Sequence, residues 1–189
     1  MRPRQAGFTM IELMIVVAVI SILVSVAVYA YSRSVRKARS TEITAMFAEL
    51  KAREEAYKTE FGRYLPVCPN PAGTPFADCA ETDLWPALPG KGQAIDITVG
   101  IPARWTQLRI APGKASLYCQ YAVVAGLAGT AVPGGYARGQ LLYGAAAIPY
   151  NWYYLVAQCD WDGDPAATAN AWYWQRGDST ELGRENELR

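Results

Sequence analysis

An unbroken apolar segment near the amino terminus constrains this chain more than any other feature. Between Phe8 and Tyr31, Glu12 is the only residue with an ordinary charged side chain. The segment is long enough to cross a bilayer as a helix, and it exceeds the apolar region of about 7–15 residues in a signal peptide. A carboxylate in a membrane helix costs roughly 2.5–3.5 kcal/mol on insertion scales, so Glu12 is a candidate functional residue.

The residues around the start of this segment form a recognisable motif. A short basic leader with Arg2 and Arg4 ends at Gly7, and the apolar run begins directly after it. The stretch from Gly7 through Phe8 to Glu12 and onward resembles the amino terminus of the type IV pilin family, over roughly the first fifty residues. This resemblance implies cleavage between Gly7 and Phe8 by a prepilin peptidase, N-methylation of Phe8, and assembly through Phe8 and Glu12.

Two positions depart from the usual pilin pattern. Ala6 stands where a lysine or arginine usually precedes the glycine, and Tyr29 stands where major pilins usually carry a helix-breaking proline. Without that proline every backbone amide in the region can donate, so we expect a continuous helix through Tyr29. The second departure favours a minor pilin or a pseudopilin of type II secretion, which shares this amino terminus, over a major pilus subunit.

The resemblance implies a fold, a location and partners. The expected fold is α+β, with a long amino-terminal helix packed against an antiparallel sheet. The protein is expected to span the inner membrane once and then to enter a filament, on the cell surface or in the periplasm. Its expected partners are other pilin subunits, the prepilin peptidase and a pilus or secretion assembly platform. An unrelated membrane-anchored periplasmic binding protein or enzyme is the remaining alternative.

The chain divides into four expected segments. They are a leader (1–7), a membrane or filament-core helix (8–31), its amphipathic continuation (32–61) and a globular head (62–189). No glycine or proline occurs from Phe8 to Glu60, and Gly62 is expected to end the helix. The apolar face of the continuation comprises Ile43, Met46, Phe47, Leu50, Tyr57 and Phe61. The opposite faces carry the i,i+4 pairs Glu49–Arg53 and Glu54–Lys58.

Strand signals follow a proline-rich loop over residues 65–92. The expected strands are 94–99, 104–111, 116–125, 151–158 and 170–175, and a glycine-rich segment (126–144) interrupts them. Alternation predicts that the residues at odd positions in the third and fourth strands share the core face. These residues are Leu117, Cys119, Tyr121, Val123, Tyr153, Leu155, Ala157 and Cys159.

Four cysteines, all after the apolar segment, predict disulfides in an oxidising compartment. Four cysteines allow three connectivities. Cys68 and Cys79 lie in one loop, where a bridge would close it, and Cys119 and Cys159 occupy core-facing strand positions. The sequence therefore favours Cys68–Cys79 and Cys119–Cys159.

Catalytic and ligand-binding signals are sparse. The chain has no histidine, which removes the commonest general base, and its formal net charge of +1 comes without a basic stripe for nucleic acid. We therefore expect no enzyme, no nucleic-acid partner and no cofactor. Asp160, Asp162 and Asp164 form a candidate Ca²⁺ site, with an Asp-Gly turn as the rival interpretation. The late cluster of tryptophans indicates core and subunit packing, with an exposed aromatic platform for sugar or surface adhesion as the alternative.

Overall fold

The computed structural model describes residues 9–69, 79–88, 93–110, 115–161 and 170–186. The chain forms two compact units, residues 1–40 and residues 41–189, and their boundary lies inside the first helix. The second unit contains the carboxyl-terminal part of that helix and the whole head.

The first element is a single helix, α1 (Met10–Phe61), with no break at Tyr29. It ends where the sequence predicts, because Gly62 adopts a φ of 73° that side chains with a Cβ rarely adopt. The N–H of Gly62 donates to the carbonyl of Lys58 at 2.7 Å and closes the last turn. Six residues of α1 were predicted to face the core. The four from Ile43 to Leu50 are buried, and so is Tyr57, but Phe61 is 51% exposed.

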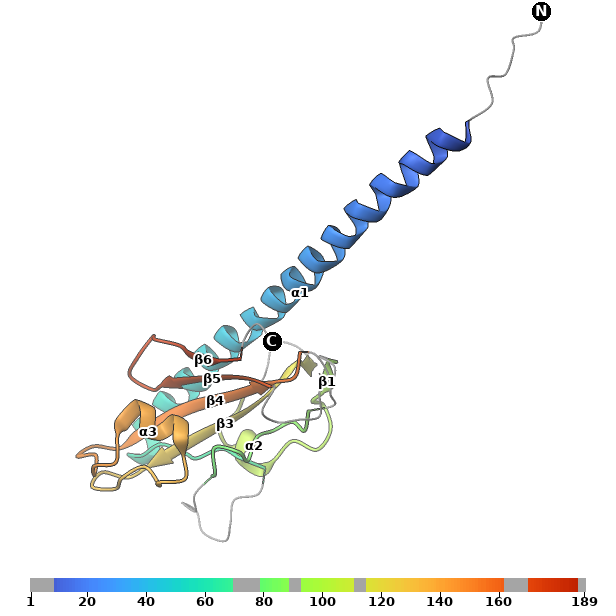
Figure 1. The fold of residues 1–189 in the computed structure, drawn as a ribbon. Coiled ribbons are helices and arrows are strands. Elements are labelled where there is room, and N and C mark those ends of the chain that lie inside the picture. Colours follow the sequence, from blue (N-terminus) through green and yellow to red (C-terminus); the bar gives the residue numbers. More distant parts are fainter. Residues whose placement is uncertain (1–8, 70–78, 89–92, 111–114, 162–169, 187–189) are drawn as a thin grey trace, which may run out of the picture. The chain divides into compact units, whose positions relative to one another are not determined.

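The head is built on a four-stranded antiparallel sheet in sequential order (Figure 1). Its strands are β3 (Cys119–Gly126), β4 (Trp152–Cys159), β5 (Ala171–Arg176) and β6 (Gly183–Glu185). The register places Cys119 opposite Cys159 and Gly126 opposite Trp152. Aromatic rings cover two glycines of the sheet: a Cβ on Gly126 would lie 2.3 Å from the Trp152 ring, and one on Gly183 would lie 2.2 Å from the Trp174 ring.

Both faces of this sheet are buried. The odd-numbered residues of β3, β4 and β5 face α1. Together with Leu117, which precedes β3, they place all eight residues predicted for the core face in one core with α1. The even-numbered residues form a second core, which α3 (Ala137–Tyr143) and its flanking loops cover. β4 is therefore buried at every position, as a central strand between two layers should be.

The free edge of β3 is also covered. Val67 and Val123 exchange backbone hydrogen bonds of 2.8 and 3.0 Å, and Trp85 and Tyr121 exchange bonds of 3.0 and 2.7 Å. A short separate ladder joins β1 (Ile95–Asp96) to β2 (Ser116–Leu117). The segment after the helix thus caps a sheet edge that would otherwise be open to pairing with other chains.

Three sequence predictions for the head were wrong or incomplete. The strand predicted over 104–111 is instead a short helix, α2 (Ala103–Gln107), which buries Trp105. The glycine-rich segment contains α3, and a further strand, β6, follows β5. Both α2 and α3 are too short for a periodic signal, so contacts with the core decide their conformation.

The charged side of α1 was also partly mispredicted. Glu49 and Arg53 form the expected ion pair, at 3.7 Å. Glu54 is not on the exposed side with Lys58: it is fully buried, and Glu55 is the partner of Lys58 at 3.9 Å. The i,i+4 spacing permits a pair, but the way the helix rests on the sheet decides which side chains face solvent.

Candidate functional site

The amino-terminal part of α1 presents its apolar side chains to the outside. From Met10 to Tyr31 every residue is exposed, and no part of the most apolar stretch is buried inside the structure. In the part of the chain that the structure describes, α1 is the one helix long and apolar enough to cross a membrane. An apolar surface of this extent needs lipid or other helices around it.

A capping box begins this helix. The hydroxyl of Thr9 accepts a hydrogen bond from the N–H of Glu12 at 3.3 Å, and a carboxylate oxygen of Glu12 accepts from the N–H of Thr9 at 3.5 Å. The Thr9 hydroxyl also lies 3.4 Å from the same carboxylate oxygen. This reciprocal arrangement satisfies backbone donors that helix formation leaves without partners. The Thr-x-x-Glu spacing from Thr9 to Glu12 is the sequence signature of this motif, and none of the expectations above includes it.

Serine hydroxyls within the apolar part of α1 are also satisfied locally. Ser21 donates to the carbonyl of Val17 at 2.8 Å, and Ser25 donates to that of Ile22 at 2.7 Å. Such bonds to the preceding turn let a hydroxyl reside in hydrocarbon without a free donor. Glu12 therefore stands out as the charged residue within this part of α1.

The residues of the expected cleavage site lie outside the described residues. Gly7 and Phe8 both precede Thr9, where the description begins. Their roles in cleavage, methylation and assembly stay predictions.

The head contains two disulfides, Cys68–Cys79 and Cys119–Cys159, the same pairs that the sequence favours. All four cysteines are fully buried. The first bridge lies between Val67 and Trp85, the two residues that pair with the edge of β3, and the second joins the facing residues of β3 and β4. One disulfide thus cross-links two neighbouring strands of the sheet, and the other cross-links the segment that covers the edge of β3.

The structure describes one of the three residues predicted to bind Ca²⁺. Asp160 is 6% exposed and follows directly after β4, whereas Asp162 and Asp164 lie outside the described residues. Among the residues that are described, no three acidic, cysteine or histidine side chains group as ligands for a metal ion. Calcium binding at Asp160, Asp162 and Asp164 stays a prediction.

Three buried glutamates were not expected: Glu42 and Glu54 on α1, and Glu81 in the head. The Glu42 carboxylate accepts hydrogen bonds from the Tyr118 N–H and from the Tyr121 hydroxyl, at 3.0 and 2.9 Å. Glu54 accepts from the N–H of Leu65 at 2.9 Å. Since each carboxylate satisfies groups distant in the chain, these residues connect α1 to the head.

The third buried glutamate, Glu81, lies on the opposite side of the sheet. It pairs with Arg138 at 3.4 Å and accepts a hydrogen bond from the Tyr154 hydroxyl at 3.3 Å. The Arg138 guanidinium lies over the Trp172 ring at 3.6 Å and also pairs with Glu185 at 3.2 Å. This cluster attaches α3 to the sheet. No sequence periodicity could have indicated it, because its five members come from five different segments of the chain.

The fold and the amino-terminal segment together define a class: an α+β head on a helix whose first half is bare and apolar. Comparison with known proteins gives this class a name. Residues 2–28 match the model of the prokaryotic N-terminal methylation motif. Prepilin peptidase-dependent protein D of Escherichia coli (strain K12) is 37% identical over 59 residues, which cover 31% of this chain and 40% of that protein. No solved structure matches the chain.

These matches and the α+β architecture support assignment of the chain to the type IV pilin and pseudopilin family. The motif lies on the segment whose apolar residues are exposed in the structure. Because the aligned region covers 40% of the relative, the resemblance concerns only part of each protein. The family points to a structural subunit and not to an enzyme.

Proposed function

We propose that this chain is a structural subunit of a type IV pilus filament, made as a prepilin and assembled through its amino-terminal helix. In this proposal prepilin peptidase cleaves between Gly7 and Phe8, and the new amine of Phe8 is methylated. The observation that carries the proposal is the exposed apolar surface of α1 from Met10 to Tyr31. Lipid covers this surface before assembly, and the helices of other subunits cover it afterwards.

Glu12 supplies the specificity of docking in this proposal. The Phe8 ammonium of an incoming subunit pairs with Glu12 of a neighbour, so that two charges expensive in hydrocarbon neutralise each other. The capping box supports this role, because Thr9 holds the carboxylate at the amino-terminal end of the helix. The assembly platform and the peptidase are separate proteins. The reference to prepilin peptidase in the name of the Escherichia coli relative agrees with this step.

A pseudopilin of type II secretion is the second candidate. It shares the amino-terminal motif but forms a short periplasmic filament. The specific observation that favours it is Tyr29, which stands within an unbroken helix where major pilins carry proline. A membrane-anchored binding protein or enzyme with a similar anchor ranks below both.

Intact-mass measurement of the chain from membranes tests the processing step. Co-expression with an active prepilin peptidase should remove residues 1–7 and add one methyl group, and an inactive peptidase should leave Met1 in place. Gly7→Glu is the matched variant, since it changes the residue before the expected cut and preserves the whole apolar segment. A product that keeps Met1 with active peptidase, or one that starts beyond Tyr31, would contradict the assignment.

Shearing of cells in the native host separates the two filament types. A pilus subunit should appear in sheared surface filaments, and a pseudopilin should remain with the cells and support secretion of folded cargo. Deletion of the gene should then abolish surface filaments in the first case and secretion in the second. Loss of neither would favour the anchored binding protein.

A further inference from the structure

Cations follow the apolar segment of α1, and acidic residues do not. Between Glu12 and Glu42 the sequence has no carboxylate side chain, and four cations occur within seven residues. They are Arg33, Arg36, Lys37 and Arg39. Because residues four apart are neighbours on a helix surface, Arg33 and Lys37 share one face of α1.

The charges of Arg33 and Lys37 are not compensated within the described part of the chain. Both residues are exposed, and neither forms an ion pair with another described residue. The next acid along the chain, Glu42, is buried, and its carboxylate accepts hydrogen bonds from the Tyr118 N–H and the Tyr121 hydroxyl. These two cations are therefore available to a partner outside the chain.

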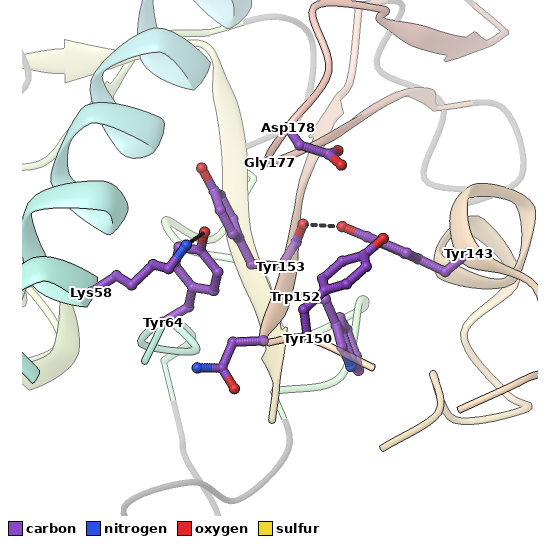
Figure 2. Close-up of a pocket in the computed structure, with 9 residues that line it drawn as sticks. Lys58, Tyr64, Tyr143, Tyr150, Trp152, Tyr153, Gly177 and Asp178 are labelled. Carbon is purple, nitrogen blue, oxygen red and sulfur yellow. Dashed lines mark hydrogen bonds between the residues drawn. The ribbon is translucent and has the colours of Figure 1, made fainter. Parts of the chain in front are cut away.

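The charged groups at a pocket of the head differ in this respect (Figure 2). This pocket of ≈ 290 Å³ is lined by aromatic rings and by Lys58 and Asp178. Lys58 pairs with Glu55 at 3.9 Å, and Asp178 pairs with Arg176 at 2.7 Å. Its charges are thus compensated inside the protein and select no charged ligand, whereas those of Arg33 and Lys37 select an anion.

Two tyrosines lie between the most apolar part of α1 and these cations. Tyr29 is 73% exposed and Tyr31 is 72% exposed. Tyr29 lies four residues before Arg33, so Tyr29, Arg33 and Lys37 follow one line along the helix surface. Tyrosine is enriched at membrane–water interfaces, because its ring is apolar and its hydroxyl is polar. The order of apolar residues, tyrosine and cation is that of a helix which passes from hydrocarbon into the headgroup layer.

The length of the helix agrees with this position. At about 1.5 Å per residue, α1 runs roughly 32 Å from Glu12 to Arg33. The hydrocarbon core of a bilayer is about 30 Å thick. A helix with Arg33 in one headgroup layer therefore places Glu12 near the other, and the long side chains of arginine and lysine extend toward the headgroups.

We propose that the face with Tyr29, Arg33 and Lys37 binds the headgroup of an anionic phospholipid while the subunit is in the membrane. This inference rests on the proposed membrane-inserted precursor and adds the class of lipid that it selects. An arginine guanidinium donates two parallel hydrogen bonds to a phosphate, and a lysine ammonium acts as a point charge. Phosphatidylglycerol brings a net negative charge to these cations. Phosphatidylcholine has the same phosphate but carries its own cation, so it leaves their charge uncompensated.

The test is a lipid titration of the full chain in polyoxyethylene detergent, followed by native mass spectrometry, which counts the lipids bound to each molecule. The probes are dioleoylphosphatidylglycerol and dioleoylphosphatidylcholine, which have the same acyl chains. Phosphatidylglycerol should bind at least about fivefold more tightly, the effect of one cation at an anionic surface. Higher ionic strength should reduce this difference. Displacement of the lipid by equimolar inorganic phosphate would indicate a site for free anions and would overturn the proposal.

Charge variants locate the binding. Arg33→Gln and Lys37→Gln should each weaken the binding of phosphatidylglycerol about fivefold and leave that of phosphatidylcholine unchanged. Arg53→Gln is the matched control, because it removes the same charge from a side chain that is 41% exposed on the same helix. It should change neither affinity. Equal affinity for the two lipids, an unchanged preference in Arg33→Gln and Lys37→Gln, or an equal loss in Arg53→Gln would each contradict the proposal.

Two further results separate this inference from its alternatives. Loss of self-association in Arg33→Gln and Lys37→Gln, with the lipid preference retained, would assign the face to a second subunit and overturn the proposal. Processing is measured independently by intact mass. A chain that keeps Met1 with active peptidase but prefers phosphatidylglycerol would contradict only the proposed function. A processed chain without a lipid preference would contradict only this inference.

Discussion

The carboxylate of Glu54 accepts a 2.9 Å hydrogen bond from the main-chain N–H of Leu65, so a fully buried acid on α1 fixes the chain just after the helix ends. Its other carboxylate oxygen has no partner among the described residues. Burial raises the pKa of Glu54 from 4.5 to about 8, although the bond from Leu65 lowers it in part. The group is therefore largely protonated in the folded head at neutral pH.

This raised pKa predicts how stability depends on pH. Between pH 4.5 and about 8 the unfolded chain has lost the Glu54 proton while the folded chain still holds it. The folded state binds more protons in this window, so its free energy of unfolding falls as pH rises. Glu54→Gln is neutral throughout and can still accept from Leu65, so it should flatten this dependence and be the more stable protein near pH 8. Denaturant unfolding, followed by tryptophan fluorescence at the two ends of the window, measures the effect.

Glu49→Gln is the matched control, because it makes the same substitution on the same helix at a residue that is partly exposed. Equal slopes for wild type and Glu54→Gln would contradict the assignment of the proton to Glu54.

Arg138 should contribute strongly to the stability of the head. Arg138→Ala removes the partner of the buried Glu81 carboxylate and the stack on Trp172, so we expect a loss of about 3–5 kcal/mol, the usual cost of breaking a buried pair. Arg138→Lys keeps the charge but loses the planar guanidinium. Its stability should therefore lie between that of the wild type and that of Arg138→Ala. The double variant with Glu81→Gln should lose less than the sum of the single losses. A strictly additive result in chemical unfolding would show that Glu81 and Arg138 act independently.

The disulfides should each stabilise the head by roughly 2–4 kcal/mol, through closure of chain segments of 11 and 40 residues. Peptide mapping without reduction should recover Cys68 joined to Cys79 and Cys119 joined to Cys159. Replacement of each pair by alanine should lower the melting temperature, with the larger effect for the longer segment. Four free thiols, or crossed pairs, would contradict the connectivity.

Glu12→Ala should block assembly and spare folding. The variant removes a costly charge from the apolar helix, so membrane insertion should persist, and the head should oxidise normally. In a filament the neighbouring Phe8 amine would lack a partner, at a cost of several kcal/mol, so the fraction of the protein in sheared filaments should drop.

Thr9→Ala separates docking from capping. It breaks the capping box, worth about 1 kcal/mol, but keeps the carboxylate. It should therefore assemble much better than Glu12→Ala. Similar defects in the two variants would mean that Glu12 acts through the start of the helix. Normal incorporation of Glu12→Ala into filaments would show that docking does not require Glu12.

The helix should remain continuous through Tyr29 in the assembled filament, as it is in α1 here. Tyr29→Pro removes a backbone donor and introduces a clash, at about 3 kcal/mol or more in a regular helix. A filament map of the wild type should show helix across residues 25–32, and one of the variant should show a kink or local extension. An extended wild-type chain in this region would refute the prediction.

Sequence reasoning was most successful for local features. The start of the apolar segment, the stop at Gly62 and the alternating face of β3 and β4 all follow from residue type and spacing. The cysteine pairs also follow, because Cys119 and Cys159 share that face and Cys68 and Cys79 share one loop. In each case a short-range physical rule decides the outcome.

Residue type and spacing therefore predict the apolar amino-terminal segment, the long helix and the core face of the central strands. They do not predict that Glu54 is buried, that α3 covers the second face of the sheet, or that Glu81 pairs with Arg138 beside Trp172. These features join residues that are far apart along the chain. Burial and ion pairing depend on which segments pack together, and the periodicity of a single segment contains no information about its partners.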